Sequence, residues 1–359
     1  MSKTADKIKE GIQSIENKTF NVFFFVMDSK GAPVGSLAYI YETARQLFDM
    51  GYNVKMLHSE KEFEGVDSWL GEKYSSLPHL NIEKDSVAVS AGDFLFIPEI
   101  YANVMSKTKD LPCKRVAILQ NFGYLTEVIP MGVSWDDLKI RDCITTTESL
   151  KNKAEKCFPG TSVHVVRPAV REMFKPSDTK KLIINVVSKN ESEINNIIKP
   201  FYWKFPEYSW VAFRNVKNLP REEFAEALRE GFATIWCDTT TDFGYSAIES
   251  MACGSIVIGK VPENTPEWID VDGLGNGMWF YNNFTAQEAI AGAIASFISE
   301  SVPDELYRSM KETVEKYDPK YQEEDIKRVY LELFENRKKE LEIALSMYNK
   351  NNEEKESEE

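Results

Sequence analysis

Residues 237–259 hold the groups that could do chemistry. They read CDTTTDFGYSAIESMACGSIVIG, with one apolar run ending shortly before Gly244 and another beginning after Gly254. This pattern predicts a strand end, a glycine turn, a short helix and a second buried strand. The N–H groups in the first turn of such a helix attract phosphate, and the carboxylate of Glu249 can accept hydrogen bonds from sugar hydroxyls. A nucleoside diphosphate sugar would satisfy both groups.

An ordinary βαβ unit is the alternative interpretation of the same spacing. In that case Glu249 is a solvated helix residue that binds no ligand. Open α/β sheets bind ligands at the carboxyl edge of their strands, which is where this helix is expected to begin. On spacing alone, both interpretations stay open.

The stretch DFGYSAIESMACGSIVIG resembles the donor-site signature EGFGLVALEAMACGTPVV of the retaining GT-B glycosyltransferases that are typified by sucrose and mannosyl transferases (family 4-like). Glu249 matches the second Glu of that family's E-x7-E motif, which implies that it accepts hydrogen bonds from the ribose. The resemblance also implies that the backbone N–H groups of Gly244 and Tyr245 face the diphosphate. Thr241 stands at the first Glu, which in the family contacts the transferred sugar, and Asp242 stands beside it. We therefore expect Thr241 and Asp242 to be the catalytic-site residues that decide the sugar and the activity.

The family also places two basic residues on the diphosphate, after the first strand of its second domain. That strand is expected at 182–187, where Ser188 and Lys189 stand in place of Gly-Arg and Ile194 occupies the second basic position. We expect Lys189 to serve as a point charge and Arg214, at the end of the next strand, to substitute for the missing cation. For both residues an ordinary surface position is the alternative.

The first half of the chain opens with a strand, a glycine loop and a helix, an order similar to the start of GT-B enzymes. The resemblance implies that Gly35 in this loop faces the donor phosphate or the acceptor, although a plain tight turn is the alternative because no G-x-G-x-x-G spacing occurs. Gln120 and Asn121 end a short apolar strand, where the family lines its acceptor side. The segment 163–176, VHVVRPAVREMFKP, resembles the family's interdomain linker.

Metal-binding patterns are weak. Asp270 and Asp272 form a D-x-D pair, but they precede the glycine-rich run DGLGNG, which favours a solvated turn. The triplet Asp242-Phe243-Gly244 spells the kinase magnesium motif without the other kinase motifs. Because the chain has three scattered His residues and five Cys residues without a C-x-x-C pair, we expect no metal and no cofactor apart from the donor substrate.

Composition limits the class of protein. A chain of 359 residues with 43% hydrophobic residues is long enough for two α/β domains. The net charge of −14 makes nucleic acid an unlikely main partner, because phosphate contacts need clustered Lys and Arg. The apolar run 20–27 is too short to span a membrane, so peripheral contact is the most that we expect. The cysteine pattern favours a reducing compartment, and we expect the protein in the cytoplasm.

The sequence therefore predicts an α/β fold with two Rossmann-like doubly wound domains that face a cleft, the GT-B arrangement. The predicted parts are an acceptor domain at 1–170, a nucleotide-sugar domain at 171–322, a helix that crosses back to the first domain at 323–350 and a disordered acidic tail at 351–359. The expected function is a retaining, metal-independent hexosyl or deoxyhexosyl transferase, acting from a nucleotide sugar onto a glycan or another hydroxyl acceptor. Two alternatives are a nucleotide-sugar-binding or scaffold protein that has lost turnover, and a DNA-modifying transferase, which would need a basic cleft.

Overall fold

The computed structural model describes residues 3–188, 190–238, 240–272 and 275–358. The chain divides into two compact units. Unit 1 comprises Met1–Thr145, Lys151–Val166 and Glu323–Glu359, and unit 2 comprises Thr146–Leu150 and Arg167–Gln322. The main passage between the units, after Val166, falls inside the stretch 163–176 that resembles an interdomain linker. The C-terminal segment from Glu323 onward belongs to unit 1 rather than to the unit that precedes it.

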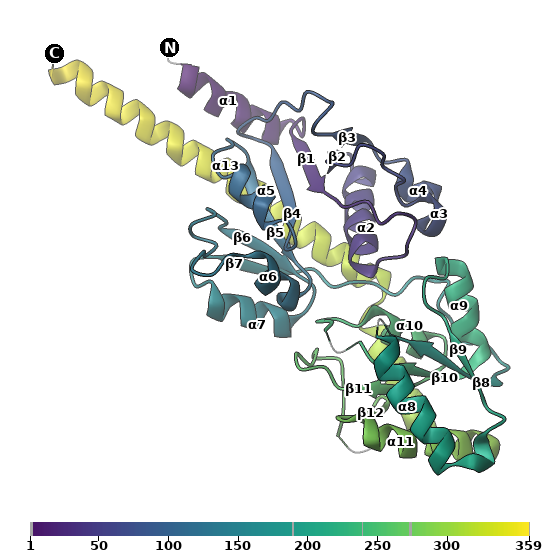
Figure 1. Cartoon of the computed structure of the whole chain (residues 1–359). Helices are drawn as coiled ribbons and strands as arrows, with labels where there is room; N and C mark the ends of the chain where they lie inside the picture. The colour runs from purple at the N-terminus through teal and green to yellow at the C-terminus, as the bar shows by residue number, and fades with distance from the viewer. Residues whose placement is uncertain (1–2, 189, 239, 273–274, 359) are drawn as a thin grey trace. The chain divides into compact units, whose positions relative to one another are not determined.

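Unit 1 is built on a seven-stranded parallel sheet with the order β3-β2-β1-β4-β5-β6-β7 (Figure 1). Its strands are β1 (Asn21–Phe25), β2 (Asn53–His58), β3 (His79–Asn81), β4 (Phe94–Pro98), β5 (Lys114–Leu119), β6 (Asp142–Thr145) and β7 (Ser162–Val165). The central strands β1 and β4 are almost continuously apolar and buried, as expected for strands that are covered on both faces. The order reverses direction at β1 and β4, so loops from the two halves of the sheet diverge at that point.

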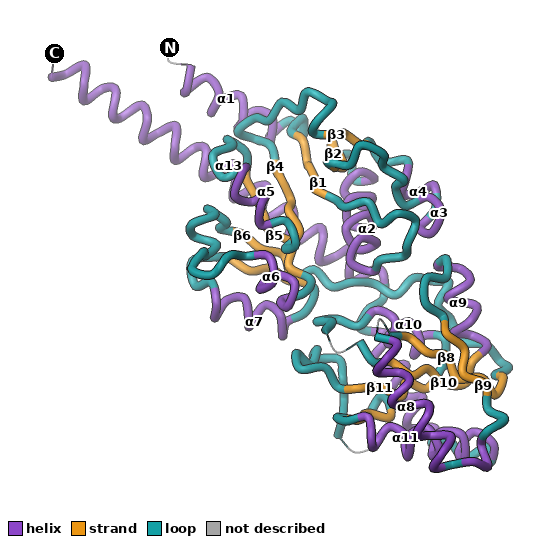
Figure 2. The backbone as a smooth tube through the Cα atoms, in the orientation of Figure 1, coloured by secondary structure: helices purple, strands orange, loops and turns teal. Residues whose placement is uncertain are grey.

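The helices of unit 1 connect and cover these strands (Figure 2). They are α1 (Lys3–Glu16), α2 (Gly35–Asp49), α3 (Asp67–Leu70), α4 (Glu72–Ser75), α5 (Ala102–Lys107), α6 (Phe122–Val128), most of α7 (Glu148–Cys157) and most of α13 (Pro319–Glu358). The helix α13 packs its aromatic side chains onto the sheet. The Phe334 ring lies 4.7 Å from the Phe94 ring, and the Tyr330 ring lies 5.0 Å from the Phe96 ring. This aromatic contact anchors the returning C-terminal helix in the core of unit 1.

The end of α13 differs from the sequence-based expectation. The composition of 351–359 predicts disorder, yet the structure has α-helix through Glu358. Glu and Lys are good helix formers even without apolar anchors, so the continuation of an already nucleated helix is physically reasonable.

Unit 2 contains a five-stranded parallel sheet with the order β12-β11-β10-β8-β9. Its strands are β8 (Lys181–Val187), β9 (Ala212–Asn215), β10 (Gly231–Trp236), β11 (Ile256–Lys260) and β12 (Met278–Phe280). Its helices are α8 (Glu191–Lys204), α9 (Arg221–Glu230), α10 (Tyr245–Ala252), α11 (Asn283–Ile298) and α12 (Asp304–Glu315), with a 3-10 turn η1 (Pro206–Tyr208).

The fully buried strand β10 lies at the centre of this sheet. Its last residue, Trp236, pairs with Val187 of β8 on one side and with Gly259 of β11 on the other. The chain therefore leaves β10 at the carboxyl edge, between the ends of two neighbouring strands. The strand, turn, helix and strand predicted for 237–259 are present as β10, the turn, α10 and β11.

Candidate functional site

The turn before α10 is fixed by a glycine against two tryptophans. Gly244 has φ 83° and ψ 53°, in the left-handed region that disfavours other residues. A Cβ atom at this position would lie 2.8 Å from the Trp236 ring and 3.2 Å from the Trp268 ring. The indole Nε1 of Trp268 also donates to the Phe243 carbonyl at 2.6 Å. The start of α10 is therefore held in one place, with the N–H groups of its first turn directed out of the helix at the carboxyl edge.

Thr241 shapes the same turn. Its hydroxyl oxygen accepts a hydrogen bond from the Gly244 N–H at 3.1 Å and a longer one from the Phe243 N–H at 3.4 Å. Short hydroxyl side chains often close turns in this way. The Gly244 N–H, which the family resemblance directs at a diphosphate, is thus used inside the loop. The structure gives Thr241 an organising role that sequence reasoning did not foresee.

Glu249 is buried and paired rather than solvated. It lies in α10 with 8% of its surface exposed, and its Oε1 lies 3.5 Å from Nη2 of Arg221, the first residue of α9. The Arg221 guanidinium also lies over the Phe174 ring, 5.7 Å from its centre. The simple interpretation of Glu249 as a solvated residue is therefore wrong. A carboxylate offers about four acceptor positions, so the ion pair with Arg221 does not by itself exclude hydrogen bonds from sugar hydroxyls.

A second ion pair lies at the carboxyl edge. Lys260 is the last residue of β11, and its Nζ lies 2.5 Å from Oε1 of Glu193 in the first turn of α8. The side chains are 23% and 13% exposed. Sequence reasoning missed both residues, because a single Lys after a strand and a Glu in a helix's first turn carry no distinctive signal by themselves.

Comparison with known proteins shows which proteins this architecture resembles. No family model matches the chain. Over 308 residues it is 21% identical to an alpha-1,6-glucosyltransferase of Actinobacillus pleuropneumoniae serotype 7, which covers 81% of this chain and 89% of the relative. Sucrose-phosphate synthase from Thermosynechococcus elongatus superposes with a TM-score of 0.65 at 11% identity, covering 88% of this chain and 100% of that chain. HepE of Anabaena, solved in complex with UDP-glucose, gives 0.62 at 11% identity, covering 87% and 99%.

The chain has the GT-B fold. Within this fold, the expected donor half corresponds to unit 2. Gly244, Tyr245 and Glu249 lie on one turn and one helix there, with Thr241 and Asp242 in the loop that leads to them. Asp242 is only 4% exposed. Such burial is unusual for a carboxylate, because burying a charge costs free energy unless the charged group has partners.

Two basic residues, Lys189 and Arg214, were expected to bind the diphosphate, and the structure does not place both of them beside α10. Lys189 lies outside the described residues. Arg214 donates from Nε to Asn185 Oδ1 at 2.9 Å, from Nη1 to Glu230 at 2.7 Å and from Nη2 to the Ala227 carbonyl at 2.5 Å. Glu230 ends α9 immediately before β10, at the amino edge of the sheet. The guanidinium thus reaches away from the carboxyl edge, and the geometry does not support Arg214 as a phosphate ligand in the GT-B donor half.

In unit 1 the structure brings two expected residues near each other. Gly35 is the exposed first residue of α2, and the Nε2 of Gln120 donates to the carbonyl of its neighbour Ser36 at 3.0 Å. Gln120 is 7% exposed, and its Oε1 has no hydrogen-bond partner among the described residues. Asn121 accepts from the Tyr124 N–H at 3.1 Å and so caps α6. Gln120 therefore offers a buried polar acceptor at the carboxyl end of β5.

The D-x-D pair closes a local turn. The Asp270 Oδ1 accepts from the Asp272 N–H at 3.0 Å, and the Asp270 N–H donates to Asn276 Oδ1 at 3.1 Å. Across the part of the chain that the structure describes, no three His, Cys, Asp or Glu side chains come together as a metal-ion group. A search of the same residues for a helix long and apolar enough to cross a membrane finds none.

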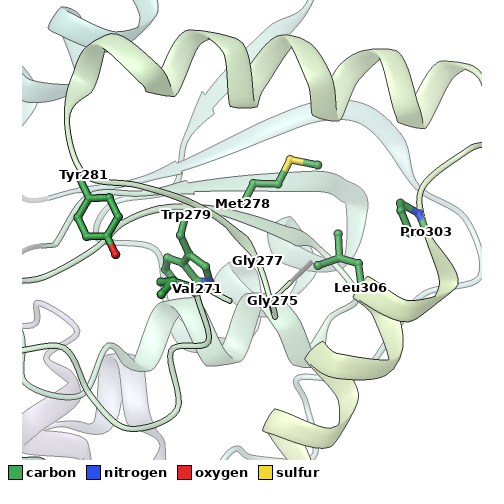
Figure 3. A pocket seen from close by; sticks show the side chains of 8 residues that line it. All are labelled: Val271, Gly275, Gly277, Met278, Trp279, Tyr281, Pro303 and Leu306. Atoms are coloured by element: carbon green, nitrogen blue, oxygen red, sulfur yellow. The ribbon is translucent and has the colours of Figure 1, made fainter. Parts of the chain in front are cut away.

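A hollow of about 310 Å³ lies beside the edge strand β12 (Figure 3). Its lining is largely apolar and aromatic: Val271, Gly275, Gly277, Met278, Trp279, Tyr281, Pro303 and Leu306. None of the expected donor-site residues lines it.

Proposed function

We propose that the protein is a glycosyltransferase that takes its sugar from a nucleotide-sugar donor, bound in unit 2. One observation carries the proposal: the buried Glu249 carboxylate, contacted by Arg221, lies just beyond the glycine-fixed start of α10. In the proposed complex, Glu249 accepts hydrogen bonds from the ribose hydroxyls. The first-turn N–H groups of α10 stabilise the diphosphate, both when it binds and when it leaves.

UDP-glucose is the first donor to test. The comparison with HepE supports this choice, because HepE was solved with UDP-glucose, and so does the relative named as a glucosyltransferase. The acceptor is proposed to be a glycan or another hydroxyl compound presented by unit 1. The buried Oε1 of Gln120 would accept a hydrogen bond from an acceptor hydroxyl, because a buried acceptor without a partner is costly.

Retention of the anomeric configuration and independence of metal ions are part of the proposal. Their support is the resemblance of 242–259 to retaining enzymes, in which the leaving phosphate assists the incoming hydroxyl. The engagement of the Asp270 carboxylate in its own turn agrees with a role in loop structure. In this mechanism helix N–H groups and basic side chains offset the charge on the leaving diphosphate.

Calorimetric titration with UDP tests the proposal. Glu249→Ala should weaken UDP binding by about 1.5–3 kcal/mol, the usual worth of hydrogen bonds to a charged group. Glu226→Ala is the matched control, since Glu226 is an exposed carboxylate on α9. Unchanged UDP affinity in Glu249→Ala would remove Glu249 from the site, and absence of UDP binding to the unmodified protein would remove the function.

A binding protein without turnover is the second candidate. It is favoured by one specific observation: where the family has a sugar-contacting Glu, Thr241 directs its hydroxyl oxygen at its own loop. UDP-glucose that binds tightly but is neither hydrolysed nor transferred to any glycan in an acceptor screen would support this candidate over the enzyme.

A further inference from the structure

Lys260 and Glu193 meet across the end of the central strand of unit 2. Lys260 ends β11 on one side of β10, and Glu193 lies in the first turn of α8, which follows β8 on the other side. Cys237, the first residue after β10, is level with Lys260, because Trp236 of β10 pairs with Gly259 of β11. Burial and, secondarily, the Glu193 carboxylate raise the pKa of the Cys237 thiol to about 12, whereas Lys260 opposes this shift. The pair therefore sits where the chain leaves β10 for the turn and α10.

A carboxylate of the protein itself, that of Glu193, already provides a negative charge at this position. The Glu193 carboxylate is in the first turn of a helix, where the N–H groups favour negative charge, and it contacts the Lys260 ammonium at 2.5 Å. Both side chains are largely buried, so each needs a partner of opposite charge. A diphosphate, with more charge and more acceptor oxygens than a carboxylate, is an anion that could compete for the same lysine.

The other basic residues on the described strands of this sheet serve the opposite edge. They are Lys181 of β8 and Arg214 of β9, and both bind Glu230. Glu230 immediately precedes β10 and so marks the amino edge. Among the basic residues on the described strands of this sheet, Lys260 is the one at the carboxyl edge, where the turn before α10 begins.

We propose that Lys260 binds the diphosphate of the donor and that Glu193 holds the lysine in position until the donor displaces it. This inference rests on the proposed function, because it names a further residue of the same site. The ligand class is a nucleoside diphosphate or its sugar ester. Binding exchanges one partner of the lysine for another, so Lys260 keeps a counter-charge, while the displaced Glu193 carboxylate stays at the first turn of α8, where the N–H groups favour negative charge.

The test compares UDP with uridine, which lacks the phosphates. UDP affinity is measured by calorimetry and uridine binding by ligand-observed NMR, for the unmodified protein and for Lys260→Met and Glu193→Gln. Lys260→Met should weaken UDP binding by about tenfold or more and leave uridine binding unchanged. Glu193→Gln should strengthen UDP binding, because the competing carboxylate is gone. Lys181→Met, which removes an ion-paired lysine at the opposite edge of the same sheet, should change neither affinity.

The double variant Lys260→Met/Glu193→Gln guards against a folding defect, since it leaves no buried charge unpaired. It should bind UDP as weakly as Lys260→Met, so that the gain from Glu193→Gln disappears when Lys260 is absent. Equal UDP affinity in the unmodified protein and the double variant would overturn this inference alone. Failure of the unmodified protein to bind UDP would overturn the proposed function and, with it, this inference.

Discussion

Arg221 Nη2 and Glu249 Oε1 lie 3.5 Å apart, and only 13% and 11% of the two side chains are exposed. The two residues lie on consecutive helices: Arg221 opens α9, which leads into β10, and Glu249 lies in the middle of α10, which follows β10. The pair therefore ties together the two helices that flank the central strand. The Arg221 guanidinium supplies a charge that favours burial of this carboxylate, and if Glu249 accepts the ribose, Arg221 also orients the acceptor.

Arg221→Met should lower both stability and nucleotide affinity. Removing the guanidinium leaves Glu249 buried without this counter-charge, which should cost about 2–3 kcal/mol of unfolding free energy, somewhat less than for a fully buried pair in close contact. UDP binding should weaken as well, because Glu249 loses its orientation. Urea unfolding and calorimetry measure the two effects. The control is Arg308→Met, a change at an exposed position of α12; full UDP affinity in Arg221→Met would show that the arginine does not orient Glu249.

Gly244→Ala should disturb the start of α10. The new Cβ would meet the Trp236 ring at 2.8 Å in a backbone conformation with positive φ, and such strain costs about 1–3 kcal/mol. UDP affinity should fall as the helix start shifts. Gly292→Ala is the matched control, because a Cβ at Gly292 in α11 meets nothing within 4 Å and should be neutral or stabilising. Thermal unfolding with and without UDP distinguishes the two variants, and identical behaviour would argue against a sterically fixed turn.

The turn before α10 should depend on the hydroxyl group of Thr241 and not on its methyl group. Thr241→Val keeps the shape but removes the oxygen that accepts from the N–H groups of Phe243 and Gly244. We expect a loss of about 1 kcal/mol of unfolding free energy and weaker UDP binding. Thr241→Ser keeps the oxygen and should behave like the unmodified protein in both measurements. If Thr241→Ser were as damaging as Thr241→Val, the hydroxyl would not be the group that matters.

Lys180 should give the stability of unit 2 a measurable dependence on pH. Its Nζ donates to the carbonyls of Leu228 and Cys253, and burial lowers its pKa from 10.5 to about 8. Between these two values the unfolded chain binds a proton that the folded protein does not, so this residue makes the unfolding free energy rise with pH. Below pH 8 both states hold the proton, so Lys180 adds no pH dependence there, and the cost of burying its charged amine is fully present.

The effect is isolated by comparing the unmodified protein with Lys180→Met from pH 7 to 10.5. Buried tyrosines with raised pKa, such as Tyr317, oppose the trend in both proteins at the alkaline end, so the difference between the two curves is the quantity of interest. The unmodified protein should gain stability relative to the variant above pH 8. Parallel curves would mean that Lys180 titrates normally.

The fold could be predicted because its signals are local. Three local features mark strand, turn, helix and strand in order: the apolar run of β10, the left-handed glycine at 244 and the β-branched run of β11. Each of them acts on the backbone of its own segment. The long C-terminal helix was predictable from its periodic apolar residues, of which Ile326, Val329 and Leu333 are fully buried. Its return to unit 1 was implied by the family resemblance rather than by this pattern.

The charged part of the site could not be predicted in the same way. Glu193 and Lys260 are 67 positions apart and meet only because β8 and β11 both flank β10, an order that no local pattern specifies. Arg214 is at the predicted place in the chain, yet its side chain runs to Glu230 at the other edge. Side-chain direction on a strand depends on register and on the available partners, and neither is visible from spacing along the chain.

We propose that Asp242 helps to set the individual function of this chain. It is 4% exposed and stands in the loop that Thr241 closes, one residue after the position of the family's sugar-contacting Glu. If Asp242 contacts the donor sugar, Asp242→Asn should reduce transfer from UDP-glucose much more than it reduces binding of UDP, because only the sugar contact is lost. Asp272→Asn, at an exposed turn position, is the control and should leave transfer intact. Equal losses of UDP and UDP-glucose binding in Asp242→Asn would instead place this carboxylate at the phosphates, where its charge would repel the ligand.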